Sequence, residues 1–397
     1  MGLELPSATC DVLRPLGTSV FAEMTRLAQQ HGAVNLAQGF PDFDGPETAK
    51  AAAVAAVRAG HSQYARMFGL PLLNRAIAES WNARTGAGVD PDRHVTVTSG
   101  CTEAIAATLL GLLNPGDEIV IFEPFYDSYR ACVGLARATA RFVALRPQGP
   151  GEPFGFDERE LRAAFTARTR AILLNTPHNP TGKVFSRDEM VLIAALCQQH
   201  GAVAITDEVY EYLTYDPLRP HIPMATIPGM EDRTITLSSL GKTFSLTGWK
   251  VGWAIAPDHL TAAVRAAHQF LTFTTATPLQ HGAAAIIAAP GDEIARVRAL
   301  YMENRDTLAA TLDEIGFTVF PSHGTYFMMA DHTRLGRGDD VALCRYLAEH
   351  VKVAAIPPTA FYDRTELGRG LLRFAFCKKK ETIADAVARL RVLAPAR

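Results

Sequence analysis

The sequence has no excess of charge of either sign. Its 397 residues include 39 Lys and Arg against 41 Asp and Glu, a formal net charge of −2 at pH 7. Proteins that bind nucleic acid usually need a basic surface for the phosphates, so no nucleic-acid partner is expected. Charged residues are too few, at 20%, for a disordered chain, and the 48% of hydrophobic residues can form a large core.

Cysteine and long hydrophobic runs are scarce as well. The six cysteines include no C-x-x-C pair, which favours reduced thiols and no bound metal: Cys10, Cys101, Cys132, Cys197, Cys344 and Cys377. The N-terminal segment lacks the basic and apolar stretches of a signal peptide, and Pro6 stands where a myristoylation motif requires Ser or Thr. No apolar run is long enough to cross a bilayer. We therefore expect a cytoplasmic protein that does not bind a membrane.

Short β-branched runs alternate with helical patterns over the middle of the chain. The expected strands include residues 94–98, 118–122, 171–175, 202–206 and 234–238. A helix is expected to begin at Ser186, because Glu189 three residues later completes a capping box. This alternation is typical of an α/β domain with a mostly parallel sheet.

The pattern changes to α+β after about residue 285, and the first forty residues show no strand pattern. We therefore expect three parts along the chain. They are an N-terminal arm with part of a small domain at residues 1–45, a large domain at residues 46–285, and a small C-terminal domain at residues 286–397.

Small and polar residues follow the expected strands, at the end where α/β sheets bind ligands. Gly100 precedes a helix, where free N–H groups suit a phosphate, although a plain tight turn explains it equally well. Asn179 stands in a loop stiffened by two prolines and a glycine, so its amide either binds a ligand or closes an Asn turn. Asp207 ends another strand, where a buried carboxylate needs a cationic partner, unless it serves as the N-cap of a helix. If a helical turn begins there, Tyr210 lies on the same face of the helix as Asp207.

Two lysines, Lys242 and Lys250, follow the strand at residues 234–238. A P-loop requires glycine five residues before Gly241, and threonine stands there, so a nucleotide-binding protein is the weaker alternative. Ser239-x-x-Lys242 matches the S-x-x-K of penicillin-binding enzymes, but their K-T-G and S-D-N motifs are missing. There remain a solvated lysine and a lysine that forms a Schiff base. An aldehyde cofactor would also need a carboxylate at its ring nitrogen, donors at its phenolic oxygen, and cations and N–H groups at its phosphate.

Three motifs closely resemble the fold-type I pyridoxal-phosphate aminotransferases of class I/II, in that family's order. They are N-P-T-G at residues 179–182, D-E-V-Y at residues 207–210 and S-x-x-G-K-x-F-x-x-x-G-W-K-x-G-W at residues 238–253. Within the family, residues 35–46 and 371–378 are similar to the kynurenine/glutamine transaminase branch, which includes N-succinyldiaminopimelate aminotransferases, with likeness to actinobacterial ones. The resemblance covers nearly the whole chain. It implies a mostly parallel seven-stranded sheet between helices in the large domain, a smaller α+β domain, and a homodimer.

The resemblance also implies a role for each residue of a pyridoxal 5′-phosphate site. Lys242 would form the Schiff base and move the proton, Asp207 would pair with the pyridinium nitrogen, and Tyr210 would hydrogen-bond the cofactor's O3′. The other implied contacts are Asn179 at O3′, Tyr126 on the ring, Gly100, Cys101, Thr102, Ser239 and Lys250 at the phosphate, and Tyr64 at the phosphate of the partner subunit.

For the substrate, the resemblance implies that Arg373 binds the α-carboxylate, with Gly39 and Asn179 beside it. Arg373 interrupts an apolar strand, and its guanidinium there needs a carboxylate from a ligand or from an internal acid. Because Thr102 and Thr274 replace aromatic and imidazole side chains of the animal kynurenine enzymes, kynurenine is a less expected substrate.

Aromatic residues are expected to rim the substrate pocket. They are Phe21, Tyr64, Tyr126, Phe273 and Phe361, of which Tyr64 and Phe273 would reach the site of the partner subunit. Core packing would explain Phe21 and Phe361 equally well. No second arginine for a distal carboxylate is evident, although Arg14 or Arg66 could serve.

The expected function is therefore pyridoxal-phosphate-dependent transamination between an L-amino acid and a 2-oxo acid. An aromatic, methionine-like or glutamine-like amino donor suits the expected pocket. The alternatives on the same scaffold are an N-succinyldiaminopimelate aminotransferase and a cysteine-conjugate β-lyase.

Overall fold

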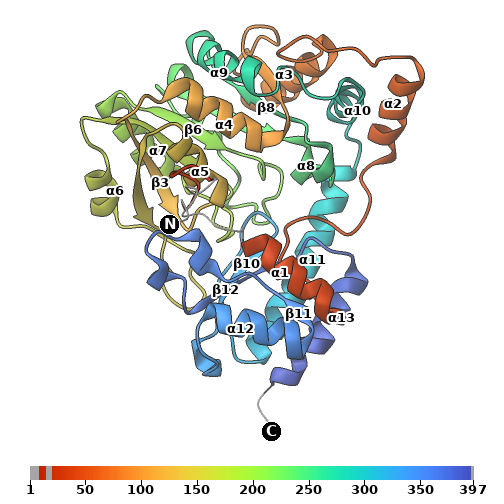
Figure 1. Cartoon of the computed structure of the whole chain (residues 1–397), viewed down its shortest axis with the longest axis vertical. Coiled ribbons are helices and arrows are strands. Elements are labelled where there is room, and N and C mark those ends of the chain that lie inside the picture. Colours follow the sequence, from red (N-terminus) through yellow and green to blue (C-terminus); the bar gives the residue numbers. More distant parts are fainter. Residues whose placement is uncertain (1–8, 15–19, 395–397) are drawn as a thin grey trace, which may run out of the picture.

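The structure is a computed structural model that describes residues 9–14 and 20–394. Figure 1 shows an upper part around one large sheet and a lower part with the smaller sheets. The large sheet has seven strands in the order β2-β8-β7-β6-β5-β3-β4. They are β2 (Val95–Thr98), β3 (Glu118–Glu123), β4 (Thr139–Ala144), β5 (Thr169–Asn175), β6 (Val203–Asp207), β7 (Thr234–Ser239) and β8 (Gly252–Ile255). Because β8 alone in this sheet runs antiparallel to its neighbours, the expected mostly parallel sheet is confirmed.

Helices cover both faces of this sheet because its strands are apolar on both faces. In β3, Ile119 and Ile121 pack against one group of helices, and Val120 and Phe122 pack against another. The first group is α4 (Gly100–Leu112), α5 (Asp127–Leu135) and α9 (Asp258–Leu271), and the second is α6 (Glu158–Ala164) and α7 (Arg187–His200). The expected capping box at Ser186 is present at the start of α7. The remaining helices of the upper part are α2 (Glu47–Arg58), α3 (Pro71–Thr85), α8 (Leu240–Thr243) and α10 (Thr277–Ala288).

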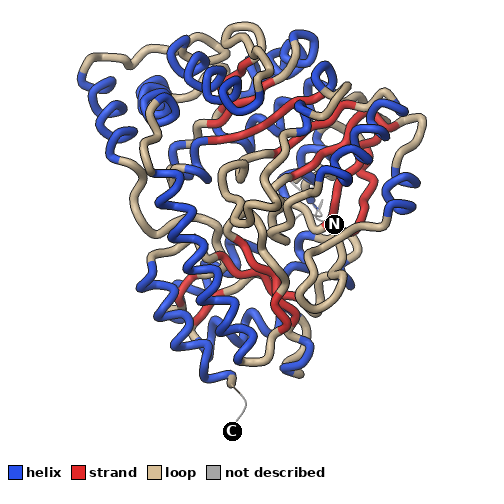
Figure 2. The backbone as a smooth tube through the Cα atoms, turned by 180° about the vertical axis from the view of Figure 1, so that it is seen from behind, coloured by secondary structure: helices blue, strands red, loops and turns tan. Residues whose placement is uncertain are grey.

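The short strands of the lower part (Figure 2) come from both ends of the chain. The two-residue β1 (Val34–Asn35) pairs in parallel with β11 (Val353–Ala354), so the first forty residues contain a short strand although their sequence shows no strand pattern. A separate antiparallel sheet consists of β12 (Leu371–Ala375), β10 (Phe327–Asp331) and β9 (Thr318–Val319). The helices around these sheets are α1 (Val20–His31), α11 (Glu293–Glu314), α12 (Asp340–Tyr346) and α13 (Lys380–Leu390).

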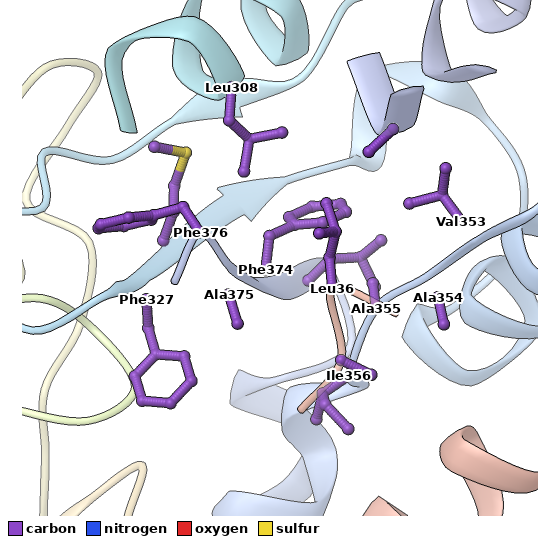
Figure 3. Packing of buried hydrophobic residues seen from close by; sticks show 14 of the residues in the cluster. Leu36, Leu308, Phe327, Val353, Ala354, Ala355, Ile356, Phe374, Ala375 and Phe376 are labelled. Carbon is purple, nitrogen blue, oxygen red and sulfur yellow. The ribbon is translucent and has the colours of Figure 1, made fainter. Parts of the chain in front are cut away.

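The core of the lower part joins the N-terminal and C-terminal segments. Leu36, just after β1, is buried in one cluster with Ile356 and Phe374 (Figure 3). Its N–H donates to the Ala354 carbonyl at 3.0 Å, and its carbonyl accepts from Ala375 N–H at 2.7 Å. The chain that follows Leu36 is therefore fixed to the C-terminal strands. None of the described helices is both long and apolar enough to cross a membrane.

Candidate active site

A cavity of about 280 Å³ lies at the carboxyl ends of the central strands. Asn175, Asp207 and Ser239, the last residues of β5, β6 and β7, line it, and Gly100 lines it from the start of α4. Most of the site residues expected from the sequence meet here: Gly39, Gly100, Cys101, Thr102, Tyr126, Asn179, Asp207, Tyr210, Ser239, Lys242 and Lys250.

Lys242 lies in α8, the short helix that follows β7, and is enclosed by the cavity. Its Nζ is 5.9 Å from the centre of the Tyr210 ring and 5.8 Å from that of the Tyr326 ring. Burial holds the pKa of this ammonium below its usual range, although the charge of Asp207 opposes the shift. A lowered pKa increases the share of neutral amine, which is the form that acts as nucleophile and base.

Asp207 is a buried carboxylate that forms no ion pair with a described residue. Its Oδ2 accepts a hydrogen bond from Tyr129 OH at 2.6 Å. Its Oδ1 lies 3.6 Å from the Cys101 thiol and 3.4 Å from Val209 N–H. Burial raises the pKa of Asp207, although these donors oppose the shift. Because a buried carboxylate is costly without a counter-charge, the site suits a ligand that brings a protonated nitrogen.

Arg373, in β12, is fully buried beside the cavity residue Asn179. Its Nη1 donates to Asn179 Oδ1 at 3.1 Å and its Nη2 to the Ala37 carbonyl at 2.8 Å, whereas its Nε has no partner among the described residues. No carboxylate in the described part of the chain forms an ion pair with it, and burial lowers the pKa of Arg373 to about 10. A guanidinium placed in this way suits the carboxylate of a ligand.

Phe21 and Phe361 surround Arg373 and do not line the cavity directly. Their ring centres lie 5.3 Å and 5.1 Å from the guanidinium carbon, and that of Phe327 lies at 4.1 Å. Ring faces attract a buried cation. These aromatic residues therefore hold Arg373 in place, and Phe21 also packs on Phe361 at 5.7 Å between ring centres.

The start of α4 has the features of an anion site. Gly100 has a φ of +76°, and a Cβ there would lie 3.1 Å from the Lys250 side chain. Lys250 Nζ donates to Thr102 Oγ1 at 3.3 Å and forms no ion pair with the described residues. A phosphate is suited to this place, because the helix start offers free N–H groups, the glycine has no side chain in the way, and the Lys250 ammonium has no acidic partner among the described residues. Ser239 lines the same cavity.

Tyr64 and Phe273 do not line the cavity of their own chain. Tyr64 is 84% exposed, and its ring packs edge-on against Phe273 with 5.4 Å between ring centres. Phe270 is 86% exposed as well. Tyr64 and Phe273 therefore form an exposed aromatic surface.

Neither arginine considered for a distal carboxylate lines the cavity. Arg66 pairs with Asp92 at 2.8 Å, and Arg14 pairs with Asp11 at 2.6 Å. The structure, in the residues it describes, contains no group of three or more His, Cys, Asp or Glu that could hold a metal ion.

Asn175 and Tyr129 line the cavity and were not expected from the sequence. Asn175 Nδ2 donates to the Asp207 carbonyl at 2.8 Å, and its Oδ1 accepts from Asn179 N–H at 2.6 Å. An amide thus fixes two predicted site residues relative to each other. The signal that could have revealed it is the polar residue that ends the apolar run AILLN.

The chain matches the family Aminotransferase class I and II over residues 31–390. It is 47% identical over 394 residues to the probable N-succinyldiaminopimelate aminotransferase of Mycobacterium tuberculosis, which covers 97% of this chain and 98% of that protein. It is 38% identical to the methionine aminotransferase of Escherichia coli, over 96% of this chain and 97% of that one. The solved structure of N-succinyldiaminopimelate aminotransferase from M. tuberculosis matches with a TM-score of 0.94 at 47% identity, over 98% of this chain and 100% of that one. The chain therefore belongs to the aminotransferase class I and II family and is an aminotransferase with its fold-type I architecture.

Proposed function

We propose that the protein transfers the amino group of an L-amino acid to a 2-oxo acid, with pyridoxal 5′-phosphate bound in the cavity beside Lys242. The family is known to depend on this cofactor. The observation that carries the proposal is that Lys242 and Asp207 line the same cavity. Lys242 is an amine with a lowered pKa, and Asp207 is a buried carboxylate without a described cation.

The cavity residues fit the parts of this cofactor. When bound, pyridoxal phosphate supplies an aldehyde that condenses with amines and a ring that stabilises negative charge on the substrate. Asp207 would keep the ring nitrogen protonated, and Asn179 and Tyr210 would donate to the phenolic oxygen. Tyr126 would lie against the ring, and the phosphate would be held by Gly100, Cys101, Thr102, Ser239 and Lys250.

Lys242 and Arg373 would have different roles toward the substrate. Neutral Lys242 Nζ takes the proton from the substrate Cα, since a base is most effective when its pKa lies near the working pH. Arg373 binds the α-carboxylate, with Asn179 and the Gly39 backbone beside it. This fixed contact orients Cα toward the amine and lowers the entropic cost of proton transfer.

A homodimer would complete the site. We propose that Tyr64 reaches the phosphate, and Phe273 the substrate pocket, of the partner subunit, because both are exposed and neither lines the cavity of its own chain. The three-part division at residues 45 and 285 also remains a proposal. The large sheet lies within residues 95–255, and the small sheets use strands on both sides of that range.

The amino donor would carry an aromatic, methionine-like or glutamine-like side chain. Phe40, Tyr126 and Val209 give the cavity apolar walls. The cations that line it among the described residues are Lys242 and Lys250, and both have other proposed roles. A side-chain carboxylate therefore finds no free cation in the described part of the cavity.

An N-succinyldiaminopimelate aminotransferase is the second candidate. The 47% identity to a probable enzyme of that activity over 97% of this chain favours it. Its substrate would need a cation for the distal carboxylate, which would have to come from the partner subunit or from a movement of Arg14 or Arg66. A cysteine-conjugate β-lyase is a third possibility on the same site, since it begins with the same loss of the Cα proton.

Visible absorbance of the purified protein tests the proposal. Protein loaded with pyridoxal phosphate should lose its yellow colour with the right amino acid and recover it with a 2-oxo acid. A panel with phenylalanine, methionine, glutamine and N-succinyldiaminopimelate ranks the donors, and pyruvate release from a cysteine S-conjugate measures lyase activity. Lys242→Ala should show neither change. Full amino transfer by Lys242→Arg, or no uptake of the cofactor by the wild type, would contradict the proposal.

A further inference from the structure

Residues 36–40, which we call the wall segment, lead into the active-site cavity, and Gly39 and Phe40 line it. All five of its carbonyls accept hydrogen bonds from the C-terminal part of the chain. The first two are bound by β12, through Ala375 N–H and Arg373 Nη2. The wall segment is therefore attached to the same strand that carries the proposed carboxylate-binding arginine.

Lys378 binds the next part of the wall segment. Its side chain is buried, and its Nζ donates to the Phe40 carbonyl at 2.7 Å and to the Gln38 carbonyl at 3.3 Å. The ammonium lies 4.8 Å from the centre of the Phe40 ring and forms no ion pair with a described carboxylate. Burying an ammonium with only carbonyl dipoles and a ring face as compensation is costly. Stability of the fold therefore does not explain why a lysine stands at position 378.

Gly39 lies between Gln38 and Phe40, the two residues that Lys378 contacts, and Tyr326 contacts Gly39 itself. Tyr326 OH donates to its carbonyl at 2.6 Å, and a Cβ at this position would come within 3.0 Å of the Tyr326 ring. The N–H groups of Ala37 and Gln38 both donate to Asn35 Oδ1. Gly39 N–H has no acceptor among the described residues, so it remains available to a ligand in the cavity.

We propose that Lys378 is a positioning residue for the carboxylate of the substrate. It holds the carbonyls on either side of Gly39, so that Gly39 N–H stays directed at the cavity where the carboxylate binds. Its positive charge also adds to that of Arg373 at this end of the site. The inference rests on the proposed function, because it takes the carboxylate of an amino acid as the ligand of Arg373 and Gly39. Lys378 does not touch the substrate and acts through the wall segment.

Lys378→Gln tests this role, with Lys379→Gln as the matched control that removes an exposed charge one residue later. Binding of 3-phenylpropanoate, a carboxylate without an amino group, is measured by calorimetry on the protein loaded with pyridoxal phosphate. In Lys378→Gln the Kd for this ligand and the KM for the amino acid should each rise about tenfold, with smaller changes in kcat and cofactor content. Lys379→Gln should match the wild type, and Lys378→Arg, which keeps the charge and donors, should retain most of the affinity.

An unchanged Kd for 3-phenylpropanoate in Lys378→Gln overturns the proposal. A parallel loss of Tm, cofactor content and affinity also overturns it, because Lys378 would then support only the fold. If Lys378→Gln does not fold, Tyr326→Phe removes the contact to the Gly39 carbonyl and must raise the same Kd selectively. The measurement needs no amino transfer. A wild type that binds 3-phenylpropanoate but exchanges no amino groups would therefore contradict the proposed function, whereas an unchanged Kd in Lys378→Gln contradicts only the role of Lys378.

Discussion

At the scale of single residues, Asp207 is held by neutral donors where a cation would be expected. Tyr129 supplies the shortest of these contacts, at 2.6 Å to Oδ2. The hydroxyl can stabilise the ionised carboxylate without neutralising it, which leaves the negative charge for the ring nitrogen of a cofactor. Tyr129 is therefore the residue through which the electronic state of the cofactor could be tuned.

We expect Tyr129→Phe to weaken the hold of Asp207 on the cofactor. Burial already raises the pKa of Asp207, and the Tyr129 hydrogen bond opposes that shift, so the carboxyl group should become still harder to ionise in the variant. The Kd for pyridoxal phosphate should rise and kcat should fall, each about tenfold, as for a lost hydrogen bond to a charged group. Equilibrium titration and steady-state kinetics measure the two effects. Tyr346→Phe, in α12, is the control, and wild-type values in Tyr129→Phe would show that the hydroxyl is dispensable.

Residues with a local signature could be predicted from the sequence, and residues that act through a distant partner could not. Lys242 and Asp207 stand in short motifs at strand ends, and the structure brings them into one cavity. Tyr129 reaches Asp207 across 78 positions of the chain, and Lys378 reaches Gln38 across 340. A single sequence contains no signal for such contacts, because they depend on how the two parts of the chain pack.

At the scale of elements, one buried histidine connects three segments near the anion site. His268 in α9 places Nδ1 2.9 Å from Glu103 Oε1 in α4 and Nε2 2.8 Å from the Met67 carbonyl. Both ring nitrogens face acceptors, so both must carry protons to donate. Glu103 also accepts from Ser99 N–H at 3.0 Å, just before the start of α4. The charged histidine therefore helps to fix the start of the helix at which the phosphate is proposed to bind.

We expect this contact to stabilise the fold most at low pH. Burial alone would lower the pKa of His268, but the hydrogen bond and charge of Glu103 outweigh it, and the net shift is upward. The stabilisation is then fully present below the ordinary histidine pKa of about 6.5 and is lost as pH rises through the raised value. The difference in Tm between the wild type and His268→Gln should shrink from about pH 6 to about pH 9 at fixed protein and cofactor concentrations.

His281 offers a control of opposite sign. Burial and the nearby His61 lower its pKa, so protonation as pH falls should destabilise the folded state. As pH falls, the Tm of His281→Gln should therefore rise relative to that of the wild type. The Tm of His268→Gln should fall relative to the wild type over the same range. A difference for His268→Gln that is constant across this range would contradict the charged state assigned to His268.

At the scale of the whole molecule, the sequence shows patterns for the strands of the large sheet and none for the N-terminal strand of the lower part. The strands of the large sheet are apolar runs between helical patterns, and the structure places them in one mostly parallel sheet. The strand β1 has only two residues and exists because it pairs with β11, more than three hundred residues later. A strand of that length has no periodicity of its own to detect. The pairing of β1 with β11 therefore cannot be predicted from the sequence, although part of the small domain is expected within residues 1–45.

The exposed aromatic surface leads to a prediction about assembly. Tyr64 is 84% exposed and absent from the cavity of its own chain, so its proposed contact with the phosphate requires a second copy. Tyr64→Ala should lower kcat/KM at least about tenfold, since it removes a hydrogen bond to a charged group. Lys242→Ala should be inactive because it lacks the base.

Mixed dimers of these two variants decide where Tyr64 acts. In a dimer of one Lys242→Ala chain and one Tyr64→Ala chain, the site that keeps Lys242 would receive Tyr64 from the Lys242→Ala chain and should be intact. The other site would lack both groups. Mixed dimers purified through two different tags should therefore regain about half of the wild-type kcat per dimer, because catalysis of this kind needs the complete set of groups in one site. If Tyr64 acted within its own chain, neither site would be complete, and the mixed dimers would be no more active than Tyr64→Ala alone.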